Sequence, residues 1–384
     1  MCHTVGAPHL NELGYMYRRM AFHLPDKLGD MKADEQGMNV TNHMAAGVNV
    51  AYTYKEQIAS DGTKTVSANN IDVPEVELWP LAGGFLGHWG VWSEVDAVPN
   101  TTNDPGGVSL SMADIRYAEG TPDFFYNIRA GLISPEGFGA SDQWLDDANF
   151  TLLDQSRANK NQDTLVTPFG PLNSPQMGIE FGLNYEKSHL TLGMYNGYSG
   201  ATADQAGNVT ANADPTPAFF KPMDGGMKDF RVQYDQFFSD IGALTLAYYK
   251  GTVPLMQSAT AMWLDHFSQT RMYLTYFMIP GTVDLLAGYG TITNEFVTTD
   301  VNPDGTFNSS GGFFGLNYYA AAHALFTARV DQFKPNPDQT VTGYSIQASF
   351  PYDNHIFILH FNHLSSNVDG STQNDAGAAM RFLL

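Results

Sequence analysis

The chain is poor in cysteine, in charged residues and in long hydrophobic runs. Its single cysteine, Cys2, can form no internal disulfide and no cysteine-rich zinc site. Only 15% of the 384 residues are charged, and 19 Lys and Arg stand against 40 Asp and Glu. This acidic balance argues against nucleic acid as a partner, because phosphates are bound by clustered basic side chains. No run approaches the roughly twenty apolar residues of a membrane-spanning helix, so any membrane role must use strands.

Aromatic residues and glycine are abundant, and the apolar residues follow a period of two. The sequence has 25 Phe, 19 Tyr and 37 Gly. From about residue 44 onward, apolar residues alternate with small or polar ones, a pattern typical of strands whose two faces meet different environments. In one such stretch, one face carries Ile179, Phe181, Leu183 and Tyr185 and the other carries Glu180, Gly182 and Asn184. A polar second face is the expected inner wall of a barrel.

The alternation predicts about sixteen strands. Most are about ten residues long, enough to cross a bilayer core when tilted, whereas strands of soluble proteins average about five or six residues. The predicted strands are 44–56, 74–85, 88–97, 108–117, 123–133, 177–186, 188–197, 228–237, 241–251, 268–278, 282–292, 311–319, 323–333, 341–350, 355–364 and 375–384.

The connections between these strands alternate between short and long, as in barrels with short periplasmic turns and longer external loops. The long set is 57–73, 98–107, 134–176, 198–227, 252–267, 293–310, 334–340 and 365–374. We therefore predict an all-β transmembrane antiparallel up-and-down barrel in the bacterial outer membrane, formed by 44–384, with lipid against its apolar face. Residues 1–43 form a separate helical segment, a plug or a cytochrome-like remnant. The alternative is a large soluble sandwich with its aromatic faces packed inside.

Charged residues on the polar face of the strands are the candidate pore-lining groups, because they can set a field across a water-filled channel. They are Arg129, Arg231, Arg271, Arg329, Arg381, Glu94, Asp96, Glu180 and Asp235. Arg116 is also in a strand, but the alternation does not settle its face. The alternative for each of these charges is a structural ion pair that joins adjacent strands.

The longest connection, 134–176, is the candidate constriction of the channel. Loops of that length usually have a function, and in general porins the third external loop folds into the barrel. The resemblance of the predicted barrel to general porins, together with the length of this loop, makes its acidic residues candidates for the constriction: Asp142, Asp146, Asp147 and Asp154. The alternative is an ordinary surface loop.

The first thirty residues break the period of two. Leu10, Leu13, Tyr17 and Met20 recur at helical spacing, which predicts a short amphipathic helix. The segment before this helix, Cys2-His3-Thr4, matches the second half of the motif C-x-x-C-H, in which two thiols hold haem and the histidine ligates its iron.

On these residues, together with Pro8, Leu10 and Leu13-Gly14, the opening of the chain resembles fused monohaem cytochrome-porins of iron-oxidising bacteria and porins of cytochrome conduits. The resemblance implies haem c, with Cys2 forming a thioether and His3 ligating the iron. The chain departs from the family in lacking the first cysteine, which would lie two residues before Met1, and in having Leu13 where the family has Phe. We expect the natural start to lie upstream and to supply both that cysteine and a signal peptide. The alternative is a helix that plugs or caps the barrel.

Two functions remain open at this stage. The first is electron transfer across the outer membrane, from an extracellular donor toward a periplasmic cytochrome. The second is a general diffusion porin for small solutes, without a redox role. An enzymatic function has no support, because no nucleophile, base and acid are placed so that one mechanism follows.

Overall fold

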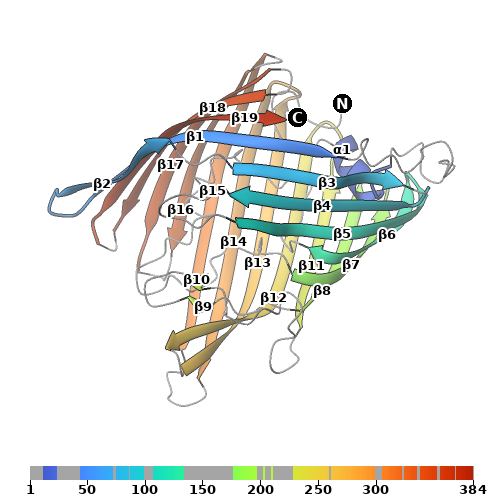
Figure 1. The fold of residues 1–384 in the computed structure, drawn as a ribbon, viewed down its shortest axis with the longest axis horizontal. Helices are drawn as coiled ribbons and strands as arrows, with labels where there is room; N and C mark the ends of the chain where they lie inside the picture. Colours follow the sequence, from blue (N-terminus) through green and yellow to red (C-terminus); the bar gives the residue numbers. More distant parts are fainter. Residues whose placement is uncertain are drawn as a thin grey trace.

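The computed structural model describes most of the predicted barrel and one N-terminal helix (Figure 1). The described residues are 12–23, 44–71, 75–85, 87–98, 107–133, 176–196, 202–203, 209–210, 228–258, 261–298, 305–321, 324–334, 338–352, 355–367 and 369–383. Within them, no helix is long and apolar enough to cross a membrane.

The helix and the strands follow one another along the chain in the predicted order. They are α1 (Glu12–Arg19), β1 (Ala45–Ile58), β2 (Lys64–Ile71), β3 (Glu75–Phe85), β4 (Trp89–Val98), β5 (Gly107–Thr121), β6 (Phe124–Ile133), β7 (Gln176–Tyr185), β8 (Ser188–Tyr195), β9 (Thr202–Ala203), β10 (Val209–Thr210), β11 (Asp229–Phe237), β12 (Gly242–Ser258), β13 (Ala261–Ile279), β14 (Val283–Thr298), β15 (Gly305–Ala321), β16 (Ala324–Lys334), β17 (Val341–Tyr352), β18 (His355–Ser366) and β19 (Thr372–Leu383).

The strands close into a ring through the pairing of the first with the last. Among the described residues, seventeen strands belong to one antiparallel sheet; β2 pairs only with β1, which leaves sixteen strands around the barrel. The β1–β19 pairing runs without a register shift from Gly47 opposite Leu383 to Ile58 opposite Thr372. On its other side β1 pairs first with β3, from Ala45 opposite Trp79, and then with β2. The predicted barrel class and its N-terminal helix are confirmed.

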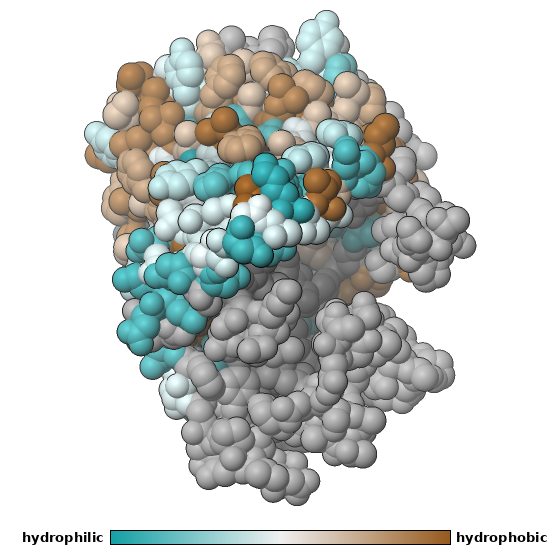
Figure 2. Space-filling model, turned by 90° about the vertical axis from the view of Figure 1, so that its left-hand side faces the viewer, coloured by the Kyte–Doolittle hydropathy of each residue, from teal (hydrophilic) through white to brown (hydrophobic). Residues whose placement is uncertain are grey.

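The two faces of the wall have the inverse polarity of a soluble protein. In β7 the inward Glu180 is 4% exposed and the outward Phe181 is 43% exposed. The same inversion holds around the ring, with Asp331 buried beside an exposed Val330 in β16. Figure 2 shows apolar side chains gathered over the outer surface in the upper part of the view, bordered by a polar zone. Outward apolar residues require lipid, so this is a membrane-spanning barrel of the outer-membrane type.

Several strands run further than the alternation predicts. The predicted loops 252–267 and 293–310 are mostly strand, because β12 and β13 have 17 and 19 residues and β14 and β15 have 16 and 17. The predicted loop 57–73 contains β2, which returns along β1, and the loop 198–227 contains the two-residue strands β9 and β10. In these regions the predicted strands were too short and the predicted loops too long. Past the bilayer both faces of a hairpin meet water, so alternation no longer marks a strand.

Helix α1 lies inside the end of the barrel at which the short turns gather (Figure 1). One of these turns, Glu186–Lys187, joins β7 to β8, and the Lys187 Nζ atom is 3.5 Å from Oε2 of Glu12 at the start of α1. Glu12 in the first turn and Arg18 and Arg19 in the last turn complement the helix dipole. The sequence order of charges therefore favours a helix at this position, and the barrel supplies the surface against which it packs.

Candidate functional site: the inner wall and the segment seated on it

A belt of acidic and basic side chains crosses the inner wall from β5 to β11. Asp114 accepts hydrogen bonds from Arg116 Nε at 2.6 Å and from Arg129 Nη2 at 2.8 Å. Glu180 then contacts Arg129 at 3.4 Å and Arg231 at 3.3 Å. All five side chains are buried or nearly so. Each acid lies between two arginines, so the charges compensate one another inside the barrel.

The belt continues toward β12 through a third acid, Asp235. The guanidinium of Arg231 donates to Gln233, whose Nε2 donates to Asp235 Oδ2 at 2.8 Å. Asp235 also accepts a hydrogen bond from Thr245 Oγ1 at 2.7 Å. We call the six charged residues of this network the charge belt; they are Asp114, Arg116, Arg129, Glu180, Arg231 and Asp235.

The remaining predicted pore-lining residues lie on other parts of the inner face. Arg329 in β16 contacts Asp331 at 2.6 Å and lies 3.7 Å from the ring centre of Phe313. Arg271 is buried in β13. Glu94 accepts a hydrogen bond from Trp79 Nε1 at 3.2 Å, and Asp96 lies two residues further along the same face of β4.

An ion pair crosses the seam of the barrel. Arg381 of β19 contacts Glu77 of β3 at 2.6 Å, although β1 lies between these two strands. In the register of these strands, Glu77 lies opposite Gly47 of β1 and Arg381 lies opposite Asn49. The predicted pore-lining residue Arg381 therefore also joins the first strands to the last.

Residues 12–23 are seated against one side of this wall through polar contacts. Tyr15 donates its hydroxyl hydrogen to Asp235 Oδ2 at 2.6 Å, and Arg19 Nη1 donates to Thr191 Oγ1 at 2.9 Å. Two helix carbonyls accept hydrogen bonds from the wall: Arg18 O from Arg116 at 3.4 Å and Arg19 O from Asn127 at 3.0 Å. These bonds satisfy carbonyls that the end of a helix leaves without partners.

Aromatic rings fix the other parts of the segment. Tyr15 packs edge-on against Phe237 with 5.2 Å between ring centres. Phe22 stacks on Trp92 at 5.7 Å, and the guanidinium of Arg116 lies 4.3 Å from the Phe22 ring centre. His23 Nε2 is 3.0 Å from the carbonyl oxygen of Trp89. Burial and the nearby His88 lower the pKa of His23, although the Trp89 carbonyl opposes this shift.

Sequence reasoning missed the residues that complete the site. It did not assign Asp114, which lies two residues before Arg116 on the same strand face, because the alternation settles the face of neither residue. Arg116, left open between the two faces, points inward at 7% exposure. Gly84 and Gly90, which face residues 21–23, had no sequence signal, because the contact joins segments that alternation does not relate.

The haem and constriction predictions fall outside the described residues. This applies to Cys2 and His3, and to Asp142, Asp146, Asp147 and Asp154 of the long loop. Within the described part of the chain, no group of three or more His, Cys, Asp or Glu is placed to hold a metal ion. Both assignments stay predictions.

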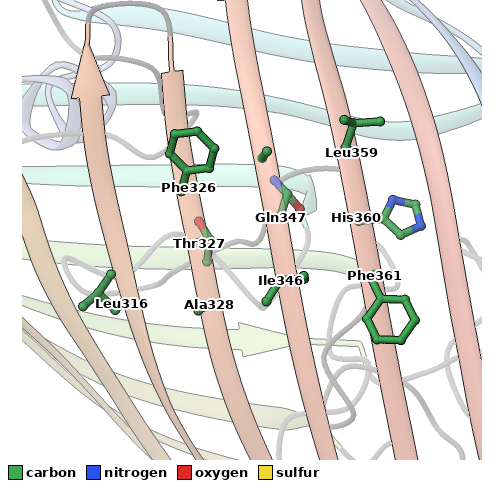
Figure 3. A pocket seen from close by; sticks show the side chains of 10 residues that line it. Leu316, Phe326, Thr327, Ala328, Ile346, Gln347, Leu359, His360 and Phe361 are labelled. Atoms are coloured by element: carbon green, nitrogen blue, oxygen red, sulfur yellow. The ribbon is translucent and has the colours of Figure 1, made fainter.

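A hollow lies on the outer, lipid-facing surface of the wall. It has a volume of about 430 Å³ across β15 to β18 (Figure 3). Phe326 of β16 and Phe361 of β18 flank it, with Ile346 of β17 between them, and all three are outward residues. The hollow is therefore separate from the interior.

Comparison with known proteins supports the fold. No protein-family model and no curated protein sequence matches the chain. The anion-selective porin of Comamonas acidovorans aligns over 88% of this chain and 99% of its own, with 9% identity and a TM-score of 0.50. OmpT of Vibrio cholerae in its trimer form aligns over 89% of this chain and 100% of its own, with 10% identity and a TM-score of 0.49. OpdL of Pseudomonas aeruginosa aligns over 89% of this chain and 98% of its own, with 10% identity and a TM-score of 0.44. By its fold, the chain is a porin-like barrel of the outer membrane.

Proposed function

We propose that the protein is a channel through which small hydrophilic solutes diffuse across the outer membrane. The observation that carries the proposal is the polarity of the closed ring: apolar side chains face outward, and hydrogen-bonded and charged side chains face inward. Barrels of about sixteen strands leave an aqueous channel, whereas barrels of about eight strands are filled by their own side chains. A polar inner wall lowers the cost of bringing a hydrated solute through the membrane.

The charge belt is electrically balanced, which favours a general channel over one built around a single anion or cation site. It contains three acids, Asp114, Glu180 and Asp235, and three arginines, Arg116, Arg129 and Arg231. Paired charges present no strong field to a passing ion.

The test is conductance of the purified full chain in a planar bilayer, together with swelling of vesicles in small sugars. We expect discrete conductance steps and swelling that slows as the sugar becomes larger. Heat-denatured protein is the matched control. Folded, inserted protein that gives neither conductance nor swelling would overturn the proposal.

The electron-transfer function is a second candidate, carried by the Cys2-His3 pair. The pair lies nine to ten positions before Glu12, in the part of the sequence that leads into α1. A haem bound there would supply a one-electron redox centre, which the side chains of the barrel lack. Haem staining and a Soret band on the purified full chain test this proposal, and their absence from folded protein would end it.

A further inference from the structure

Residues 12–23, here called the plug segment, occupy the interior at the short-turn end. Tyr15, Met20 and Ala21 are at most 3% exposed. The contacts of the segment run along one continuous arc of wall, from Gly84 in β3 and Gly90 in β4 to Asp235 in β11. A helix with its side chains is about 10–12 Å wide. The segment therefore lies in the opening at this end and takes up at least the width of one helix.

Polar contacts and aromatic packing together hold the plug segment in place, and all of them are non-covalent. The polar wall contacts of Tyr15, Arg18 and Arg19 are hydrogen bonds and one ion pair, Arg19 to Asp235 at 3.5 Å. When the segment leaves, water replaces these bonds. A helix of 8 residues is not stable alone, so α1 depends on the wall for its structure.

The wall is shaped to admit this segment. A Cβ atom at Gly90 would lie 2.8 Å from the carbonyl carbon of Ala21 and closer still to its oxygen. A Cβ atom at Gly84 would lie 2.8 Å from both Phe22 O and His23 Cε1. Neither glycine has a positive φ, unlike Gly83 and Gly87 beside them. Their lack of a side chain therefore serves the close approach of residues 21–23 and is not required by the strand backbone.

One residue beneath the helix is poorly satisfied while the segment is seated. His189 of β8 is 1% exposed, and neither ring nitrogen has a hydrogen-bond partner. Its ring lies 6.0 Å from that of Tyr15. Burying a polar group without a hydrogen-bond partner costs free energy. Water supplies the missing hydrogen bonds once the helix is released. The seat is thus complementary in shape but leaves one buried imidazole without a hydrogen bond.

The chain leaves the plug segment enough length to move. Twenty residues, 24–43, separate His23 from Met44 at the start of the barrel. Fully extended, a chain of this length spans about 70 Å, more than twice the thickness of a bilayer core. Departure from the seat would break no covalent bond and no strand pairing of the ring.

From these observations we propose that the inner wall from β3 to β12 is a binding site for the chain's own residues 12–23, and that the segment is a removable plug. When it is seated it narrows the channel at the short-turn end, and when it leaves it opens that end. This inference rests on the channel function proposed above.

The test uses the full-length protein and adds a single methyl group to the inner wall. Gly90→Ala places a methyl group where Ala21 lies and leaves the strand backbone unstrained. We expect the mean single-channel conductance to rise about twofold or more, because the displaced helix, about 10–12 Å wide with its side chains, no longer lies in the lumen. Gly107→Ala is the matched control, because a Cβ atom there would meet nothing within 4 Å. Tyr15→Phe and Arg19→Gln change only the plug segment. Both should raise the fraction of time that the channel is open, without altering the barrel.

A second measurement reports the position of the plug independently of conductance. Met20 is fully buried in the seated state. In a Cys2→Ser background, Met20→Cys should react slowly with a water-soluble maleimide, and adding Gly90→Ala should speed the reaction at least tenfold. The boiled-against-unboiled gel shift verifies that each variant is folded.

The outcomes separate the two proposals. No conductance in any folded variant would overturn the channel function itself. Equal conductance and equal labelling in the parent, Gly90→Ala and Gly107→Ala would overturn the plug while leaving the channel standing. Higher conductance and faster labelling in Gly90→Ala alone supports both.

Discussion

Glu180 shows how single side chains hold the interior together. It accepts contacts from Arg129, Arg231 and the Tyr195 hydroxyl, the last at 2.6 Å, and so joins β6, β7, β8 and β11. The sequence places Glu180 on the polar face by alternation alone. It cannot pair Glu180 with Arg231, because that contact depends on which strands become neighbours across a connection of many residues.

Removing this charge should destabilise the barrel. Glu180→Gln leaves Arg129 and Arg231 buried with less compensating charge, and breaking a buried pair costs about 3–5 kcal/mol. Reversible urea unfolding in lipid vesicles measures the change. Glu295→Gln, at an exposed position of β14, is the control and should stay within about 0.5 kcal/mol. Equal stability of the two variants would show that the belt is not structural.

At the scale of elements, the sequence predicts strands well where lipid and interior impose opposite demands. The predicted strand 123–133 is β6 at Phe124–Ile133, and 177–186 is β7 at Gln176–Tyr185. It predicts them poorly where β12 to β15 continue past the membrane, because no polarity difference remains there to mark the strand. The helix is found from its own periodicity, but its seat is not, since Tyr15 and Asp235 are 220 positions apart.

A charge on the lipid-facing side of a strand should be far more costly than an apolar exchange. Leu192 of β8 is 45% exposed on the outer face. We expect Leu192→Arg to destabilise the folded barrel by about 2–4 kcal/mol if the position is near the bilayer midplane. Leu192→Met is the matched exchange and should cost under about 1.5 kcal/mol. A tolerated arginine would mean that this face meets water.

Acid should release the plug segment. Because burial lowers the pKa of His23 in the seat, the seated form resists protonation while the released form takes up a proton near the usual value. The seat is therefore most stable above about pH 6.5 and weakens as the pH falls below it. Conductance and Met20→Cys labelling at pH 7.5 and 5.5 measure this. His23→Gln should flatten the response, and an unchanged pH profile in that variant would remove His23 from the account.

At the scale of the whole molecule, net charge is the property most directly available from the sequence. The formal charge of -21 should attract cations to the channel entrances even though the charge belt is balanced. In a potassium chloride gradient, the reversal potential should show a potassium-to-chloride permeability ratio above one, and the ratio should fall as salt is raised. A preference for chloride would indicate that the inner arginines control the field.

The central claim concerns the ring itself, with lipid outside, polar groups inside and every strand paired. Electrophoresis of the chain refolded into lipid vesicles, with and without boiling, tests it most directly, because a closed sheet resists detergent until it is heated. We expect the unboiled protein to migrate as a compact species, and boiling to shift it toward the position of an unfolded 42.1 kDa chain. Identical migration before and after boiling, from a protein that also stays monodisperse without detergent, would contradict it.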